Sequence, residues 1–212
     1  MKKIIKYLFL LTGGSFILAS CNDFLDREPL DSVTPDNFFF TENDLAAYAV
    51  KHYNFTTHEG FNAGIWKNDN ATDNQAATDY DKKWIPGQWK VPEAYDNPAS
   101  NDPWYFSTIR EANYFLETVV PRFEKGEIEG SETNIKHYIG EMYFLRAKNY
   151  LSKLETFGDF PIIKNTLPDE SESLIQASKR APRYKVAHFI LEDLDQAISL
   201  LTNNISGGKN RI

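Results

Sequence analysis

The stretch GEMYFLRAKNYLSKLETFGDFP, residues 140–161, combines a helix-forming run with an abrupt stop. Around its start, apolar residues recur every three or four positions, as they do on one face of an α-helix; they are Ile135, Tyr138, Ile139, Met142 and Leu145. Gly158 suits a left-handed C-terminal cap, because glycine adopts positive φ without a steric penalty. The sequence therefore predicts a helix over about 132–156, followed by a short extended piece at 160–163.

Two helices are predicted upstream of this stretch. Thr41 and Asp44 form a capping-box pattern, a hydroxyl at the N-cap and a carboxylate three residues later, which indicates a helix over about 42–55. Asp102-Pro103 is a second helix start, because an acidic N-cap followed by proline is favoured there. Pro121 is expected to end or kink this second helix. Its apolar face comprises Ile109, Ala112, Leu116, Val119 and Val120.

A fourth helix is predicted downstream, beginning at Pro182 after an exposed loop over 164–181. Its apolar face is expected to contain Val186, Ile190, Leu194, Ala197, Ile198 and Leu201. No strand pattern of comparable strength occurs. The predicted fold class is therefore mainly α, with TPR-like antiparallel helix pairs and long irregular loops, although the sequence has no clean 34-residue repeat.

The first 21 residues, MKKIIKYLFLLTGGSFILASC, have the pattern of a secretory signal peptide: three lysines, then an apolar stretch. Two glycines interrupt that stretch, which is short for a membrane span of about 20 residues. Leu18-Ala19-Ser20-Cys21 resembles a bacterial lipobox, and Cys21 is the only cysteine of the chain. We therefore expect a signal peptide over 1–20, a lipidated tether over 21–40 and a helical domain over 41–212.

The charge balance argues against nucleic acid as a partner. The chain has 23 basic and 30 acidic residues, and its net charge is -7. Without the three lysines of the signal peptide, the charge falls to roughly -10, and no basic cluster offsets it. Binding to nucleic acid depends on neutralising phosphates, which an acidic surface disfavours.

Catalytic and metal sites are not indicated, so we predict no enzyme activity and no cofactor. The four histidines lack metal-type spacing and are expected on exposed or helix-surface positions; they are His52, His58, His137 and His188. The acids of the loop that follows the first helix could suggest a calcium site, but no glycine-pivoted loop accompanies them. A solvated acidic loop is the favoured interpretation; its acids are Asp69, Asp73, Asp79 and Asp81.

The long loop over 56–100 is the expected ligand site. It lacks periodicity yet contains three of the four tryptophans, and loops of this length are often functional. Trp84 and Trp89 flank the Pro86-Gly87 turn, which would present both indoles for stacking on a sugar ring. Supporting contacts are expected from Asp79, Tyr80 and Trp66. The alternative is that the tryptophans pin the loop to the helical core.

Three other conspicuous residues are expected to be structural. Arg146 lies among apolar neighbours, which favours a buried ion pair, with Glu141 or Glu192 as the candidate partners. Asn113 is expected to make an interhelical hydrogen bond, and Trp104 to belong to the core.

Five motifs, in order, resemble those of the SusD/RagB-like outer-membrane lipoproteins. The motifs are Cys21–Pro29, CNDFLDREP; Trp104 followed by Ile109-Arg110 and Asn113, one residue longer than the family spacing; Gly140–Ala147 with Tyr150, Leu154 and Phe157–Pro161; Arg180-Ala181-Pro182; and Glu192-Asp193-Leu194 with Ala197 and Leu201. Members of this family are much longer, so we expect this chain to correspond to their N-terminal part.

The resemblance implies a lipoprotein anchored in the outer membrane and exposed at the cell surface. Such a protein captures oligosaccharides or other nutrients and delivers them to a SusC-like TonB-dependent transporter, without bond chemistry. The alternative function is a helical-repeat scaffold lipoprotein with no small-molecule ligand.

Lipidation at Cys21 is the first prediction that can be tested. The lipobox-like boundary and the single cysteine predict that protein extracted from membranes begins at Cys21 and has an acylated N-terminus. Mass spectrometry of the extracted protein measures this directly. A soluble mature form that begins at another residue would contradict the prediction.

Overall fold

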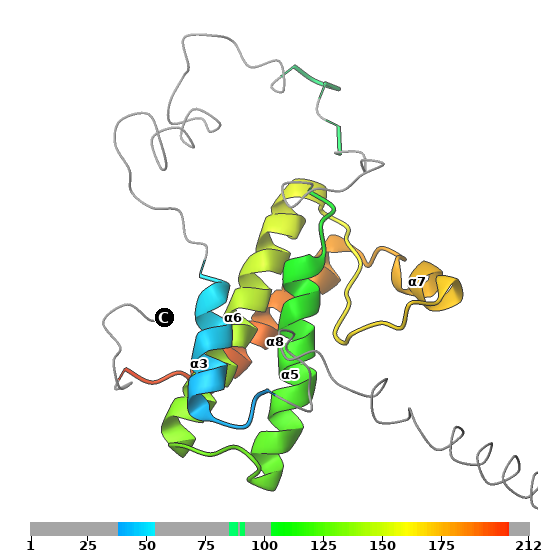
Figure 1. Ribbon diagram of the computed structural model, residues 1–212. Helices are drawn as coiled ribbons and strands as arrows, with labels where there is room; N and C mark the ends of the chain where they lie inside the picture. Colours follow the sequence, from blue (N-terminus) through cyan, green and yellow to red (C-terminus); the bar gives the residue numbers. More distant parts are fainter. Residues whose placement is uncertain (1–37, 54–84, 89, 92–102, 204–212) are drawn as a thin grey trace, which may run out of the picture. The chain divides into compact units, whose positions relative to one another are not determined.

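In the computed structural model, the described part of the chain comprises residues 38–53, 85–88, 90–91 and 103–203. It contains five helices: α3 (Glu42–Lys51), α5 (Ser107–Lys125), α6 (Glu132–Phe157), α7 (Ser171–Ala177) and α8 (Arg183–Leu200). Within these ranges there is no strand, and strand-like pairing is limited to two isolated bridges, Thr41 with Glu129 and Phe160 with Ala181. The mainly α prediction is confirmed (Figure 1).

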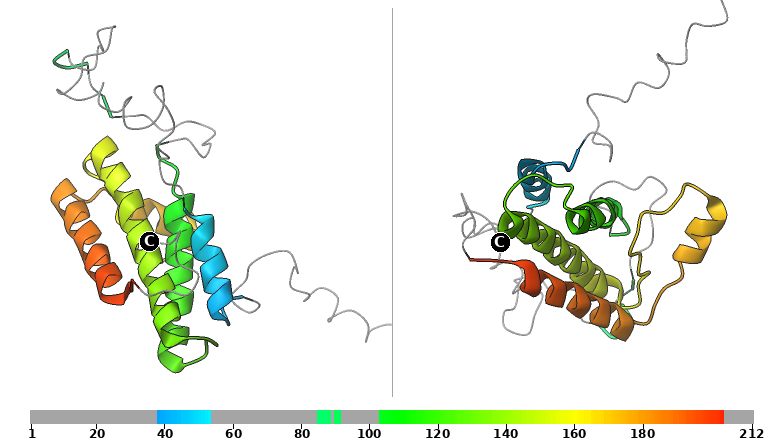
Figure 2. Two further views of the ribbon diagram at one scale, coloured as in Figure 1. Left: turned by 90° about the vertical axis from the view of Figure 1, so that its left-hand side faces the viewer. Right: turned by 90° about the horizontal axis from the view of Figure 1, so that it is seen from below.

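Helix α6 is the central element of the bundle. It packs against α3, α5 and α8. Seen from below, α6 lies between α8 and the pair formed by α3 and α5 (Figure 2). A helix covered on several sides must bury more than one face, and α6 does so with residues on both flanks of its predicted stripe.

The first helix begins as the capping-box pattern predicts. The Thr41 hydroxyl accepts from the Asp44 backbone N–H at 3.3 Å, and the Asp44 carboxylate accepts from the Thr41 N–H at 3.0 Å. These reciprocal bonds satisfy donors that every helix start leaves open. The helix ends at Lys51, four residues earlier than predicted.

Helix α5 begins later than its sequence indicates. The predicted start at Asp102-Pro103 is wrong, because Pro103 lies in a turn and the helix begins at Ser107. The intervening aromatic residues pack on the end of α6 instead: Trp104 lies 4.2 Å from Phe157, measured between ring centroids. At the other end, Pro121 does not end the helix, which continues for one more turn to Lys125.

In the downstream half of the chain, the structure differs from three predictions. The loop expected over 164–181 contains α7, a helix of seven residues. Ile198, expected on the packed face of α8, is 73% exposed. Gly158 follows α6 with φ +73° and ψ -94°, so it uses the positive φ open to glycine but lies outside the left-handed helical region. Helix α6 itself, predicted over 132–156, is confirmed to within one residue.

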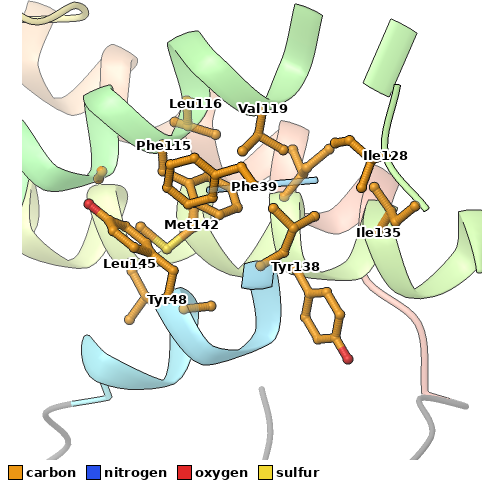
Figure 3. Close-up of a cluster of buried hydrophobic side chains, with 14 residues drawn as sticks. Phe39, Tyr48, Phe115, Leu116, Val119, Ile128, Ile135, Tyr138, Met142 and Leu145 are labelled. Atoms are coloured by element: carbon orange, nitrogen blue, oxygen red, sulfur yellow. The ribbon is translucent and has the colours of Figure 1, made fainter. Parts of the chain in front are cut away.

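The first core cluster lies where α3, α5 and α6 meet (Figure 3). Phe39 is at its centre, fully buried, with its ring 5.1 Å from Tyr48 and 5.3 Å from Phe115. Its φ is +70°, an unfavourable value for a residue with a side chain. Burial of the whole ring offsets that backbone strain, since burying a phenylalanine is worth about 1.5–3 kcal/mol.

The second cluster joins the C-terminal half of α6 to α8 and to the segment after α6. Phe160 is fully buried, and its ring stacks on Phe106 at 5.0 Å and on Phe157 at 5.2 Å. The aromatic stack holds the chain after Gly158 against the end of α6. None of the described helices is both long and apolar enough to cross a membrane.

Among the glycines of the described chain, Gly140 is the one at which α6 packs closely against the end of α8. A Cβ at this position would lie 3.1 Å from the Leu200 Cβ and 3.2 Å from the Ala197 carbonyl oxygen. We predict that Gly140→Leu lowers the free energy of unfolding by about 1–3 kcal/mol, because a larger side chain overpacks this contact. Chemical denaturation measures the change. The matched control is Ser152→Leu at an exposed position on α6, and equal stability of the two variants would contradict the tight contact.

Candidate functional site

The residues predicted to bind ligand lie outside the described part of the chain. These are Trp66, Asp79, Tyr80, Trp84 and Trp89, and the predicted lipidation site Cys21 also lies outside it. The turn between the two tryptophans is described. The Gln88 N–H donates to the Ile85 carbonyl at 3.0 Å, and Gly87 has φ +79°. Proline followed by a positive-φ glycine is the pattern of a type II turn, so the predicted turn is confirmed while the stacking pair stays a prediction.

Within the described chain, the most strongly constrained side chain is that of Arg146. Its Nε and Nη2 donate to the two carboxylate oxygens of Asp193 at 2.8 and 2.7 Å. Its Nη1 donates to the Asn113 side-chain oxygen at 2.9 Å and to the Lys164 carbonyl at 3.3 Å. The fork-shaped guanidinium thereby joins three helices and a connecting segment.

The same group of residues fixes the segment that follows α6. Asn113 Nδ2 donates to the carbonyls of Ile163 at 2.8 Å and Asn165 at 3.3 Å. The Tyr150 hydroxyl accepts from the Ile163 N–H at 2.8 Å and donates to the Ile163 carbonyl at 3.2 Å. An irregular segment next to a core must satisfy its backbone groups, and these side chains do so in place of a strand or helix.

Burial sets the electrostatics of this network. Arg146, Asp193 and Asn113 have 6%, 3% and 0% of their surface exposed. Burial raises the pKa of the Asp193 carboxyl, and the Arg146 guanidinium opposes that shift. Burial also raises the pKa of Tyr150 to about 12, so its hydroxyl stays protonated. The network is therefore a structural one in which each polar group has a fixed partner.

The sequence predicted the character of this network but not all of its members. Arg146 does form a buried ion pair, although the partner is Asp193 and not Glu141 or Glu192. Asn113 makes the interhelical bond that was expected. Trp104 is only partly buried: it packs on the second core cluster, and it also lines a cavity described below.

A second buried network contradicts one prediction about histidines. His137 is fully buried rather than exposed. Its Nδ1 accepts from the Thr202 N–H at 3.1 Å, so the proton lies on Nε2, which donates to Glu141 at 3.0 Å. The Tyr53 hydroxyl donates to the same Glu141 oxygen at 2.6 Å. These bonds tie the ends of α3 and α8 to α6, whereas His188 is exposed as predicted.

An apolar cavity of about 340 Å³ lies between the start of α5, the segment after α6 and α7. The network around Arg146 holds one of its walls, because Asn113 and Ile163 belong to both. Its lining comes from three separated parts of the chain: Trp104, Phe106, Ile109, Arg110 and Asn113; Pro161, Ile163, Asn165 and Leu167; and Leu174, Ala177 and Ser178. No single sequence motif indicated this cavity.

The described residues contain no group of three or more histidine, cysteine, aspartate or glutamate side chains placed to hold a metal ion. The buried His137 bonds to Glu141, and the buried Asp193 pairs with Arg146. The geometry thus provides apolar and aromatic surfaces together with fixed hydrogen bonds.

The fold places the chain in the class of α-helical, TPR-like proteins, with helix pairs packed around a central helix. Comparison with known families then identifies it further. A model for SusD-like proteins, described as "Starch-binding associating with outer membrane", matches residues 23–210. The chain belongs to the SusD-like family.

Individual relatives agree with this assignment. The chain is 27% identical over 203 residues to SusD-like protein P38 of Formosa agariphila, and 26% identical over 186 residues to SusD-like protein P2 of the same organism. It also resembles the crystal structure of a SusD-like protein from Bacteroides fragilis, with a TM-score of 0.54, 25% identity and 87% of this chain covered. The chain spans 37%, 35% and 34% of the lengths of these three proteins, about a third in each case.

We predict that Arg146→Met and Asp193→Leu each lower the free energy of unfolding by about 3–5 kcal/mol, because each leaves the other charge buried without its partner. The double variant should recover part of that loss, since it removes both charges. Chemical denaturation of the three variants forms a double-mutant cycle. If the double variant lost as much unfolding free energy as the two single variants together, the two residues would not be coupled.

Proposed function

We propose that the chain is part of a cell-surface glycan-binding lipoprotein that delivers oligosaccharide to a TonB-dependent outer-membrane transporter. The observation that carries this proposal is the match of the starch-binding, outer-membrane-associated family model over residues 23–210. The TPR-like fold supports it, because stacked helix pairs provide extended surfaces for a protein partner. The assigned role is binding, not catalysis.

The proposed anchor is the lipidated Cys21. Acyl chains on one cysteine hold a protein at a membrane because each buried methylene contributes about 0.8 kcal/mol. The tether over 21–40 would then connect the anchor to the helical domain. This arrangement agrees with the outer-membrane association in the family description, and it would leave the loops free to meet a ligand.

The proposed ligand platform is the pair Trp84 and Trp89, supported by Tyr80, Asp79 and Trp66. The Ile85–Gln88 turn supports this proposal, because a tight turn brings the chain on its two sides together. Indole rings there would stack on the apolar face of a pyranose, and the Asp79 carboxylate would accept from its hydroxyls. Soluble starch fragments are the natural first ligands to test, given the family description.

We predict that Trp84→Ala and Trp89→Ala each weaken binding of maltoheptaose by the full chain about two- to tenfold, because each removes one stacking surface. Thermal stability should stay unchanged, since the helices contain the core. Calorimetry measures the affinity and circular dichroism the melting temperature. The matched control is Leu191→Ala, which removes an exposed apolar side chain on α8.

The possible outcomes separate the proposed function from its alternative. Unchanged affinity in both tryptophan variants would remove these residues as the platform. A large loss of thermal stability would instead assign them to anchoring the loop. If the chain bound no oligosaccharide but still co-purified with outer-membrane proteins, a scaffold lipoprotein without a small-molecule ligand would be the better description.

A further inference from the structure

We propose that the cavity between α5, the segment 161–167 and α7 is a second binding site, and that it takes an aromatic carboxylate. This inference does not depend on the proposed glycan site, which lies in another part of the sequence. It rests on three properties of the cavity: its apolar lining, its size, and two nearby arginines, of which Arg110 lines the cavity and Arg180 contacts the lining residue Trp104.

The lining selects a flat, apolar ligand body. Most of the wall is made of aromatic, aliphatic and proline side chains: Trp104, Phe106, Ile109, Pro161, Ile163, Leu167, Leu174 and Ala177. The volume of about 340 Å³ falls within the range of small-molecule sites. A bicyclic aromatic ring would bury its apolar surface there and meet the Trp104 and Phe106 side chains.

Two guanidinium groups select a negative charge. Arg110 lines the cavity and is exposed to solvent. The Arg180 guanidinium lies 4.7 Å from the ring centroid of Trp104, which also lines the cavity. Within the described chain, no carboxylate forms an ion pair with either arginine. Because a planar guanidinium suits the two oxygens of a carboxylate, a carboxylate at the rim is the complementary group.

The polar groups of the cavity do not suit a sugar. Asn113 is already committed, since its oxygen accepts from Arg146 and its nitrogen donates to the Ile163 and Asn165 carbonyls. The Ser178 hydroxyl donates to the Ile175 carbonyl. The other two polar residues of the lining, Arg110 and Asn165, are exposed, so the hydroxyls of a saccharide that reached the apolar wall would be buried without partners, which is costly. The chemistry of this site therefore differs from that of the proposed glycan platform.

One wall of the site, formed by the segment after α6, is held in position by the core. Tyr150, Asn113 and Arg146 bind the backbone between residues 163 and 165. The Glu117 carboxylate also accepts from the Thr166 N–H at 2.8 Å. A site whose wall is fixed in this way loses little conformational freedom when a ligand binds.

The test compares 2-naphthoate with 2-naphthamide, which has nearly the same shape but no charge, as probes of the full chain. Calorimetry should show saturable binding of 2-naphthoate that is at least about tenfold tighter than that of 2-naphthamide, because only the carboxylate pairs with the arginines. Arg110→Gln should reduce this difference by weakening 2-naphthoate alone, because Arg180 remains. Ala177→Leu, which fills the cavity, should weaken both compounds.

The control variant is Arg183→Gln, which removes an exposed arginine that does not line this cavity and should leave both affinities unchanged. Circular dichroism confirms that each variant is folded before its affinity is compared. Equal binding of the two compounds, unchanged affinity in Arg110→Gln, or no saturable binding of 2-naphthoate to the folded wild-type chain would overturn the proposal. Maltoheptaose binding is measured separately, so either proposal can fail alone.

Discussion

The constraint on which the rest of the structure depends is the pairing of the buried Arg146 guanidinium with Asp193. A buried arginine is costly unless its donors are used, and four hydrogen bonds here join it to Asp193, Asn113 and the Lys164 carbonyl. Each of these groups comes from a different part of the chain. Pairing the hydrogen-bond donors of Arg146 thus fixes α5, α6, α8 and the segment after α6 in a single arrangement. Apolar packing alone would accept several registers between the helices, whereas this network accepts one.

The network also connects the fold to the surfaces that can bind ligands. The residues that anchor positions 163–165 form a wall of the apolar cavity, so the core and the proposed carboxylate site share side chains. The histidine network around Glu141 fixes the opposite half of α6 to the ends of α3 and α8. Both halves of α6 are thus fixed to the neighbouring helices by buried polar side chains.

Local patterns in the sequence predicted those parts of the fold that local interactions determine. The capping box at Thr41 needs only neighbouring residues, and the stripe of α6 needs only a helical period. Periodicity placed Val186, Ile190 and Ala197 of α8 correctly in the core but misplaced Ile198, because apolar residues cover two adjacent faces of this helix and only tertiary packing selects between them. Helix α7 is too short to show a period. The partner of Arg146 and the cavity depend on residues up to about 70 positions apart, which no single motif reveals, and the tryptophan platform remains a prediction from composition and turn chemistry.

The central claim is that the Arg146 network couples α5, α6, α8 and the segment 163–165, so that they unfold as one cooperative unit. Native-state hydrogen exchange of the wild-type chain and of Arg146→Met measures this directly, amide by amide. If so, the slowest-exchanging amides of α5, α6 and α8 and the Ile163 amide have the same opening free energy. The Arg146→Met substitution then lowers each of these opening free energies by the same amount. If exchange accelerated only at 163–165 and on α8, while α5 and α6 kept their protection, the network would be a local contact and the account would be wrong.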